Sequence, residues 1–180
     1  MKILQADEFL GLFEQCKESA FHIEVRDAYA VPDESEPFRR FLRNEEDDYE
    51  WFRDWLNIVN ALGKRGAIMT RVRVVTEPHS DYHRWLLKTT KLNAEAGEDI
   101  RYLSRQMVDA SKVPSDDWWI FDNHQVVFNL VDNEGRPAGG AATTDIQIVE
   151  HCRRVREQLW EMAIPYPEYF RSSAEGTDRP

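Results

Sequence analysis

Two kinds of apolar spacing alternate along this chain, and the alternation limits the folds open to it. Residues 9–16 and 52–62 carry apolar side chains every three or four positions, as in an amphipathic helix. Residues 21–25 and 71–74 instead alternate apolar with polar side chains, as in a half-buried strand. Elements of both kinds in one chain pack as helices against a sheet. We therefore predict an α/β or α+β fold with a mixed sheet of about five strands and flanking helices.

The last third of the chain predicts a hairpin and a closing helix. Residues 118–131 read as a strand, "DNEG" supplies a turn, and a return strand extends to Ala142. Apolar residues then recur at helical spacing over 148–162. A chain of 180 residues with 42% apolar content can bury one core. We predict a single domain over residues 1–167 and a disordered polar tail over 168–180.

The charge balance bears on partners and location. Asp and Glu number 33 against 23 Lys and Arg, which gives a net charge of −10. Because this charge repels a phosphate backbone, we expect no direct nucleic-acid binding. Residues 1–15 lack a basic segment followed by an apolar run, and no window holds the roughly 18 apolar residues that span a bilayer. We expect a cytoplasmic protein that does not bind membranes.

The only cysteines are Cys16 and Cys152, and each lies on the apolar side of a helical pattern. Such positions favour buried free thiols over a disulfide or a redox pair. The six tryptophans leave two interpretations open. They can form an exposed aromatic rim for a protein partner, or they can pack partly buried in the core.

The stretch "EPHSDYHRW", residues 77–85, places His79 and His83 four positions apart. A zinc pair at this spacing needs both histidines on one face of one helix. Ser80 is the natural cap of the helix, so His79 precedes it and only His83 lies within it. No third ligand is marked by spacing. We therefore favour two surface histidines beside a helix start over a metal site, and we expect no cofactor.

Arg71 and Arg73 share one face of a predicted strand, and Arg101 lies on a neighbouring candidate strand. These arginines can form a basic face for a small anionic ligand. Pairing with acidic residues is the favoured alternative, the nearest in pattern being Glu24, Glu77, Glu98 and Asp99. Asp116, Asp117, Asp122 and Asn123 can bind a cation or act as acid and base, but they are more typical of a strand-entry loop and of a bend or bulge.

The segments "AFHIEVRDAYAV", "PFRRFL", "RVRVVTEPHSDYHRW", "NAEAGEDIRYLSR" and "DDWWIFDNHQVV", in this order, resemble an actinobacterial family of unknown function. Genes of that family commonly lie beside those of helix-turn-helix regulators. The resemblance covers roughly residues 9–165. It implies association with a transcriptional or signalling operon and supplies no catalytic residues. The family's recurrent positions in the 77–85 stretch are Pro78, Ser80, Asp81, Tyr82 and Arg84, without either histidine.

The order strand, helix, "DIRYLSR", then "WWIFDNHQVV" is also similar to degenerate relatives of the phospholipase D fold that serve as sensor domains. Catalysis in that family uses a histidine nucleophile with a lysine two residues further on, which helps to bind phosphate. Here His124 is followed by Gln125 and Val126, so the lysine is missing. The resemblance therefore implies the fold without phosphodiesterase activity.

Together these observations predict a non-catalytic interaction or ligand-sensing module that acts with a separately encoded helix-turn-helix regulator. A homo-oligomer is compatible with this function. The alternative is a small hydrolase or transferase, with or without a metal, in which Asp81, His83 and either Asp122 or His124 meet in one pocket. The predicted ligand-binding residues of the module are Arg71, Arg73, Asp81, Tyr82, Arg84, Arg101 and Asp122.

Overall fold

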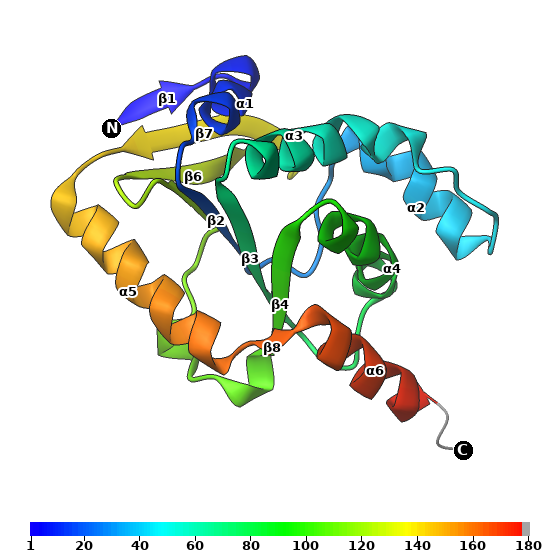
Figure 1. Ribbon diagram of the computed structural model, residues 1–180. Helices are drawn as coiled ribbons and strands as arrows, with labels where there is room; N and C mark the ends of the chain where they lie inside the picture. The colour runs from blue at the N-terminus through cyan, green and yellow to red at the C-terminus, as the bar shows by residue number, and fades with distance from the viewer. Residues whose placement is uncertain (178–180) are drawn as a thin grey trace.

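Eight strands form one mixed sheet in the computed structural model, which describes residues 1–177 (Figure 1). The strand order is β1-β7-β6-β5-β2-β3-β4-β8. The central strands β2, β3 and β4 run parallel, and the other pairs are antiparallel. The predicted single α+β domain with a mixed sheet is confirmed, although the sheet has eight strands and not about five.

The elements follow one another along the chain with short connections, and four short 3-10 turns lie between them. The strands are β1 (Lys2–Leu4), β2 (Ser19–Glu24), β3 (Ile68–Val75), β4 (Glu98–Ser104), β5 (Trp118–Phe121), β6 (Gln125–Val131), β7 (Pro137–Thr143) and β8 (Ile164–Pro165). The helices are α1 (Ala6–Gln15), α2 (Ser35–Leu42), α3 (Arg53–Lys64), α4 (Asp81–Glu95), α5 (Ile146–Met162) and α6 (Tyr166–Thr177).

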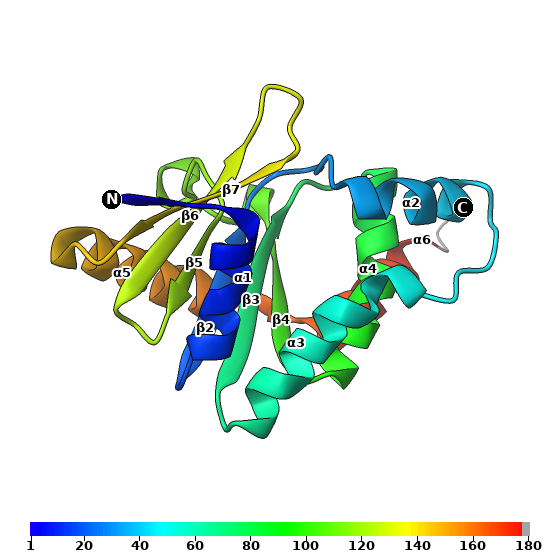
Figure 2. The same cartoon turned by 90° about the horizontal axis from the view of Figure 1, so that it is seen from above.

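The two faces of the sheet differ in chemistry. The face covered by α5 is apolar, and Ile23, Val72 and Trp118 pack there with Leu159 of the helix. The opposite face carries α1 and α3 over its β2–β7 part and α4 over β4. Figure 1 shows α1 and α3 above the sheet with α5 below it, and Figure 2 shows α2 beside α4. The second face contains buried charges, as described below.

The predicted strand over residues 118–131 is wrong as one element, because a tight turn divides it into β5 and β6. Asp122 and Asn123 both have positive φ, 48° and 57°, and His124 N donates to Phe121 O at 3.1 Å. Two such residues form the type of turn whose twist suits a two-residue hairpin. Strands β5, β6 and β7 therefore form an antiparallel meander within the one sheet. The predicted closing helix is present as α5.

Strands β1 and β8 were not predicted, because three and two residues are too few to show a period. β1 lies against β7, where the backbone of Gly139 has φ +90°. A Cβ at this glycine would lie 2.1 Å from Leu4 O, so the close approach of the two strands requires glycine.

The segment predicted as a disordered tail is helical as far as Thr177, and residues 178–180 lie outside the described part of the chain. Tyr166 and Tyr169 are 9% and 4% exposed, and the Tyr169 ring stacks on Tyr102 with centroids 4.7 Å apart. Burial of these two rings holds α6 against β4. Within residues 1–177, no helix is long and apolar enough to cross a membrane.

Candidate functional site

Arg71 and Arg73 are buried in ion pairs, as the pairing interpretation predicted. Parallel register sets His22 opposite Arg71 and Glu24 opposite Arg73, so all four side chains lie on one face of the sheet. Arg71 donates to Glu24 and, at 2.6 Å, to Glu98, while Arg73 donates to the other oxygen of Glu24. We call Glu24, Arg71, Arg73 and Glu98 the central charge network.

The central charge network pairs its own charges, although one Glu98 oxygen, Oε2, is buried without a hydrogen-bond partner and burial raises the pKa of Glu98. Burial opposes ionisation of Glu24, but Arg71 and Arg73 hold the pKa of its carboxyl well below the ordinary value. Arg73 also donates to Thr90 Oγ1 at 2.6 Å and to Tyr102 Oη at 3.1 Å. Because both arginines already have carboxylate partners, they do not form the basic face for an anionic ligand considered from the sequence.

A cleft of about 320 Å³ lies beside this network, between α1, the β6–β7 hairpin and the segment that follows β2. The β6–β7 hairpin projects from the sheet in Figure 2. We call this the aromatic cleft. Its lining includes five aromatic rings, those of Phe9, Phe13, Tyr29, Trp55 and Trp119, together with the polar side chains of Arg26, Asp117 and Asn129.

Asp117 is the buried carboxylate of the aromatic cleft, with 2% of its surface exposed. Its Oδ1 accepts from Val25 N at 2.7 Å, which ties β5 to the segment after β2. Burial raises the pKa of Asp117 to about 6, although the hydrogen bond from Val25 N and the nearby Tyr29 hydroxyl oppose the rise. The group is therefore mainly ionised at neutral pH and titrates close to it.

His22 orients Asn129 toward the aromatic cleft. Burial lowers the pKa of His22 to about 4, so the ring is neutral at pH 7. Its Nδ1 lies 3.4 Å from Glu24 Oε1, a polar contact whose alignment falls short of a hydrogen bond. The carboxylate favours the proton on Nδ1, so Nε2 accepts from Asn129 Nδ2 at 3.4 Å. This arrangement leaves Asn129 Oδ1, in the lining of the cleft, as a buried acceptor without a partner.

Two polar atoms of the cleft lining are buried without a hydrogen-bond partner in the described part of the chain: Asn129 Oδ1 and Tyr29 Oη. Tyr29 lies near Asp117, and burial first, then the neighbouring carboxylates of Glu24 and Asp117, raise its pKa. An unmatched buried polar atom costs roughly 1–3 kcal/mol. Such atoms in a cleft indicate groups that a ligand can satisfy.

The raised pKa of Asp117 predicts a pH effect on stability. The folded state holds this proton more tightly than the unfolded state, whose carboxyl pKa is near 3.8. The stabilisation that protonated Asp117 gives the folded state is therefore complete below about pH 4. It is lost as the pH rises to about 6. We expect Asp117→Asn, which keeps an acceptor for Val25 N, to raise the free energy of unfolding at pH 7 by on the order of 2 kcal/mol.

Urea unfolding of both proteins from pH 4 to pH 8 measures this effect. The stability difference between Asp117→Asn and the wild type should grow across pH 4–6 and then stay level. Asp116→Asn, which removes the exposed neighbouring carboxylate, is the matched control and should show no such rise. A pH-independent difference for Asp117→Asn would contradict the assignment.

The other predicted ligand-binding residues do not meet at one site. Asp81 pairs with Arg84 on the exposed start of α4. Tyr82 is buried and donates to Glu34 Oε2 at 2.6 Å. Arg101 lies over the Trp160 ring, 3.9 Å from its centroid, on the apolar side of the sheet. Of the predicted set, the structure brings together Arg71 with Arg73 in the central charge network and, separately, Asp81 with Arg84 on α4.

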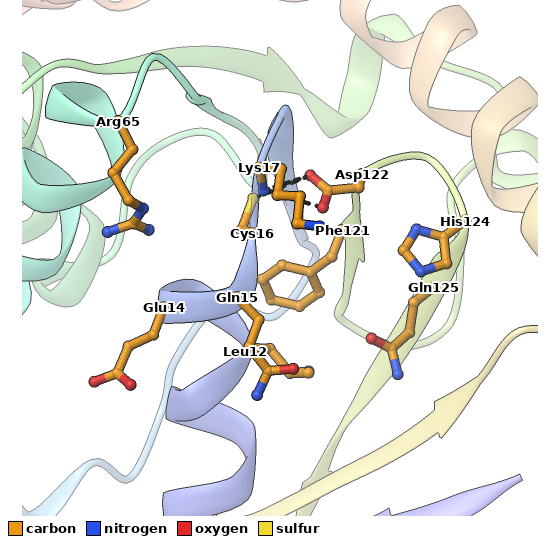
Figure 3. A pocket seen from close by; sticks show the side chains of 10 residues that line it. All are labelled: Leu12, Glu14, Gln15, Cys16, Lys17, Arg65, Phe121, Asp122, His124 and Gln125. Carbon is orange, nitrogen blue, oxygen red and sulfur yellow. Dashed lines mark hydrogen bonds between the residues drawn. The ribbon is translucent and has the colours of Figure 1, made fainter.

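Asp122 lines a separate pocket of about 750 Å³, where it binds backbone groups of the chain (Figure 3). Its carboxylate accepts from the backbone N–H groups of Lys17, Glu18 and Ser19 at 2.7–3.1 Å. Partial burial opposes ionisation, but these bonds lower the pKa of Asp122. Burial, together with Asp122, raises the pKa of the Cys16 thiol to about 12, so this thiol is not a nucleophile at neutral pH. Both cysteines are free and buried, as predicted.

The residues of the hydrolase alternative are not assembled in this pocket. Asp122 and His124 line it, but Asp81 and His83 do not. Figure 3 shows His124 on the far side of Asp122 from Cys16. The convergence that this alternative requires is therefore absent from the pocket.

The histidine pair differs in part from its prediction. Ser80 caps α4, because its Oγ accepts from His83 N, and His79 precedes the cap as expected. His83, however, is 3% exposed and not at the surface. The two rings lie 6.0 Å apart, and His79 Nε2 is 2.9 Å from Tyr169 Oη. Among residues 1–177, no group of three or more His, Cys, Asp or Glu side chains is placed to hold a metal ion.

Sequence reasoning missed Tyr29 and Asn129, because neither belongs to a motif. It favoured loop polarity over cation binding or acid–base catalysis for Asp117, and it treated Trp55 and Trp119 as an outer rim or as core. The alternation in β5 was the available indication. It places Trp118 and Trp119 on opposite faces, so one of the two had to face the polar side of the sheet.

Comparisons with known proteins give a family and a fold. A family model described as "Domain of unknown function (DUF6879)" matches residues 7–171. No curated protein matches the chain. Among solved structures, the phospholipase D family member Nuc from Salmonella typhimurium has a TM-score of 0.57 and 14% sequence identity, over 92% of this chain and 96% of that chain. This likeness shows a shared fold.

A second solved structure is TrmBL2, described as an archaeal chromatin protein with a novel mode of DNA binding. Its TM-score is 0.47 at 14% identity, and the match covers 86% of this chain. The chain spans about half of the length of TrmBL2, 47%.

Proposed function

This chain belongs to the family of domains of unknown function DUF6879, and we propose that it is a non-catalytic, ligand-sensing module that acts with a separately encoded helix-turn-helix regulator. The observation that carries this proposal is the aromatic cleft. It has a size suited to a small molecule, aromatic walls, and two buried polar atoms without partners. These are features of a ligand site and not of a closed core.

The cleft is in contact with the central charge network, which supports a sensing role. The Trp119 ring stacks on His22 with centroids 4.1 Å apart and planes at 9°. Arg71 lies 5.6 Å from the ring centroids of both Trp55 and Trp119. A ligand that moves Trp119 or turns Asn129 therefore acts on a buried network that joins β2, β3 and β4. Such a network has few alternative arrangements, so a local shift is transmitted and not absorbed.

Two observations support a module without catalysis. The fold resembles that of a phospholipase D family member, but His124 lacks a lysine two residues further on. The Asp122 carboxylate is engaged by backbone N–H groups. The regulator partner rests on the resemblance in the sequence motifs and on the net charge of −10, which suits a protein partner better than DNA.

The ligand part of the proposal is tested by blocking the aromatic cleft. Ala6 lies on the exposed start of α1 and lines the cleft, so Ala6→Trp should fill it without removing a hydrogen bond. Tagged full-length protein is purified from native lysate, unfolded, and analysed by mass spectrometry for released small molecules. We expect the wild type to release a bound compound that is reduced at least tenfold in Ala6→Trp.

Asp7→Trp is the matched control, because Asp7 is exposed and does not line the cleft. It should release as much compound as the wild type. A wild type that releases nothing, or a compound retained by Ala6→Trp, would overturn the cleft as a sensing site. In the same purification we expect a helix-turn-helix protein, and a stoichiometric metal without such a partner would favour the hydrolase alternative instead.

A further inference from the structure

The polar atoms at the inner end of the aromatic cleft are mainly hydrogen-bond acceptors. Asp117 uses Oδ1 for Val25 N, and the Tyr29 hydroxyl is its polar neighbour in the cleft lining. Asn129 presents Oδ1, because its amide nitrogen faces His22. A carboxylate and an amide oxygen side by side complement a group with two N–H donors.

The positive charges near the cleft are matched elsewhere. Arg71 has Glu24 and Glu98 as partners. Arg26, the one cationic side chain in the lining, has Nη2 3.9 Å from Asp116 Oδ1, on a carboxylate that is 57% exposed. Arg26 therefore lies toward the rim with its own counter-ion. Among residues 1–177 Asp117 forms no ion pair, and Arg26 acts on its carboxylate only as a nearby charge, so this part of the cleft favours a further positive charge.

The walls fix the shape of the ligand. Phe13 meets Trp119 edge to face, with ring centroids 4.8 Å apart, and meets Trp55 edge to face at 5.4 Å. Aromatic walls in this arrangement favour a flat ring, and aromatic faces attract cations. A volume of about 320 Å³ suits a ligand of one or two rings.

We propose that the aromatic cleft binds a flat aromatic ligand that carries a positively charged, N–H-donating edge of the amidine, guanidine or protonated aminoheterocycle type. The edge meets Asp117 and Asn129, and the ring lies against the aromatic surface that Phe13, Trp55 and Trp119 form together. This inference rests on the proposed function, which it deepens by naming the ligand class. It replaces the small anionic ligand considered from the sequence.

Three probes of nearly the same shape test the charge preference: benzamidine, benzamide and benzoate. Each is titrated into the full chain at pH 7.5 and constant ionic strength, with tryptophan fluorescence and calorimetry as readouts. Trp55 and Trp119 line the cleft and report occupancy directly. We expect benzamidine to bind at least tenfold more tightly than benzoate, with benzamide between them.

Two neighbouring carboxylates provide the variant and its control. Asp117→Asn keeps the acceptor for Val25 N and should reduce the benzamidine-to-benzoate preference to about twofold or less. Asp116→Asn removes an equal charge outside the cleft and should leave the preference within about twofold of the wild type. Circular dichroism verifies that both variants fold. Equal losses of the benzamidine-to-benzoate preference in the two variants would overturn the role of Asp117.

The remaining outcomes separate this inference from the proposed function. Tighter binding of benzoate, abolished by Ala6→Trp, overturns the ligand class and leaves the aromatic cleft as a ligand site. Benzamidine binding that Ala6→Trp does not change overturns the location. Absence of binding by all three probes also overturns this inference, whereas the proposed function fails if the native protein releases no compound or if Ala6→Trp retains it.

Discussion

Replacing Glu24 by glutamine is expected to lower the free energy of unfolding by about 3–5 kcal/mol, the usual result of breaking a buried ion pair. Glutamine has nearly the same shape, so the loss is one of charge. Glu24 is the shared partner of Arg71 and Arg73, which are 6% and 5% exposed. The change leaves Glu98 as the remaining buried anion for two guanidinium groups that cannot lose their protons.

Chemical denaturation followed by tryptophan fluorescence measures this loss. Glu36→Gln is the matched control, because Glu36 also accepts from two arginines, Arg39 and Arg43, but is 57% exposed. We expect its effect to stay below about 1 kcal/mol, since exposed pairs gain little over hydration. A loss below about 1 kcal/mol for Glu24→Gln would show that water or a side-chain shift replaces Glu24, and that the central charge network is not rigid.

Removal of the Asp122 side chain is expected to lower the free energy of unfolding by about 2–4 kcal/mol, because three backbone donors lose a charged acceptor. These donors are the N–H groups of Lys17, Glu18 and Ser19, which lead into β2. The depressed pKa of Asp122 sets the pH dependence. Its contribution is present above the ordinary carboxyl pKa near 3.8 and is lost as pH falls through the folded-state value.

Denaturant unfolding of Asp122→Ala at pH 7 and at acid pH measures both effects. The difference in free energy of unfolding between Asp122→Ala and the wild type should be largest at pH 7 and should become smaller at acid pH. Asp99→Ala, at an exposed carboxylate on β4, should change stability by less than about 0.5 kcal/mol. An Asp122→Ala variant as stable as the wild type would remove the structural role and reopen a functional one.

Much of the fold followed from local patterns. Helical spacing in 148–162 predicted α5, and alternation in 21–25 and 71–74 predicted β2 and β3. Ser80 was correctly read as a cap, because its side chain satisfies an N–H only three residues away. The turn at Asp122 was read as a bend and not as the end of a strand. Positive φ at two consecutive residues other than glycine is rare, so composition alone did not reveal it.

The candidate site was less accessible to the same reasoning. Arg71 and Arg73 were expected to pair with acids, and the pairing was found, but four acids were equally eligible in sequence. The choice of Glu24 and Glu98 came from strand register, which sets which side chains lie across from one another. Asp81, Tyr82, Arg84 and Arg101 were grouped by polarity and resemblance, and the sheet distributes them over different faces and ends.

The sequence by itself determined the α+β class, the helices and central strands, the buried free thiols and the pairing of the strand arginines. These properties depend on spacing within one segment, which a period or a cap residue expresses directly. Only the tertiary structure decided that Phe9, Tyr29, Asp117 and Asn129 line one cleft and that the central charge network lies beside it. Contacts between segments far apart in the chain depend on strand order and register. Burial then sets the charge states of His22 and Asp117, and no local pattern encodes that burial.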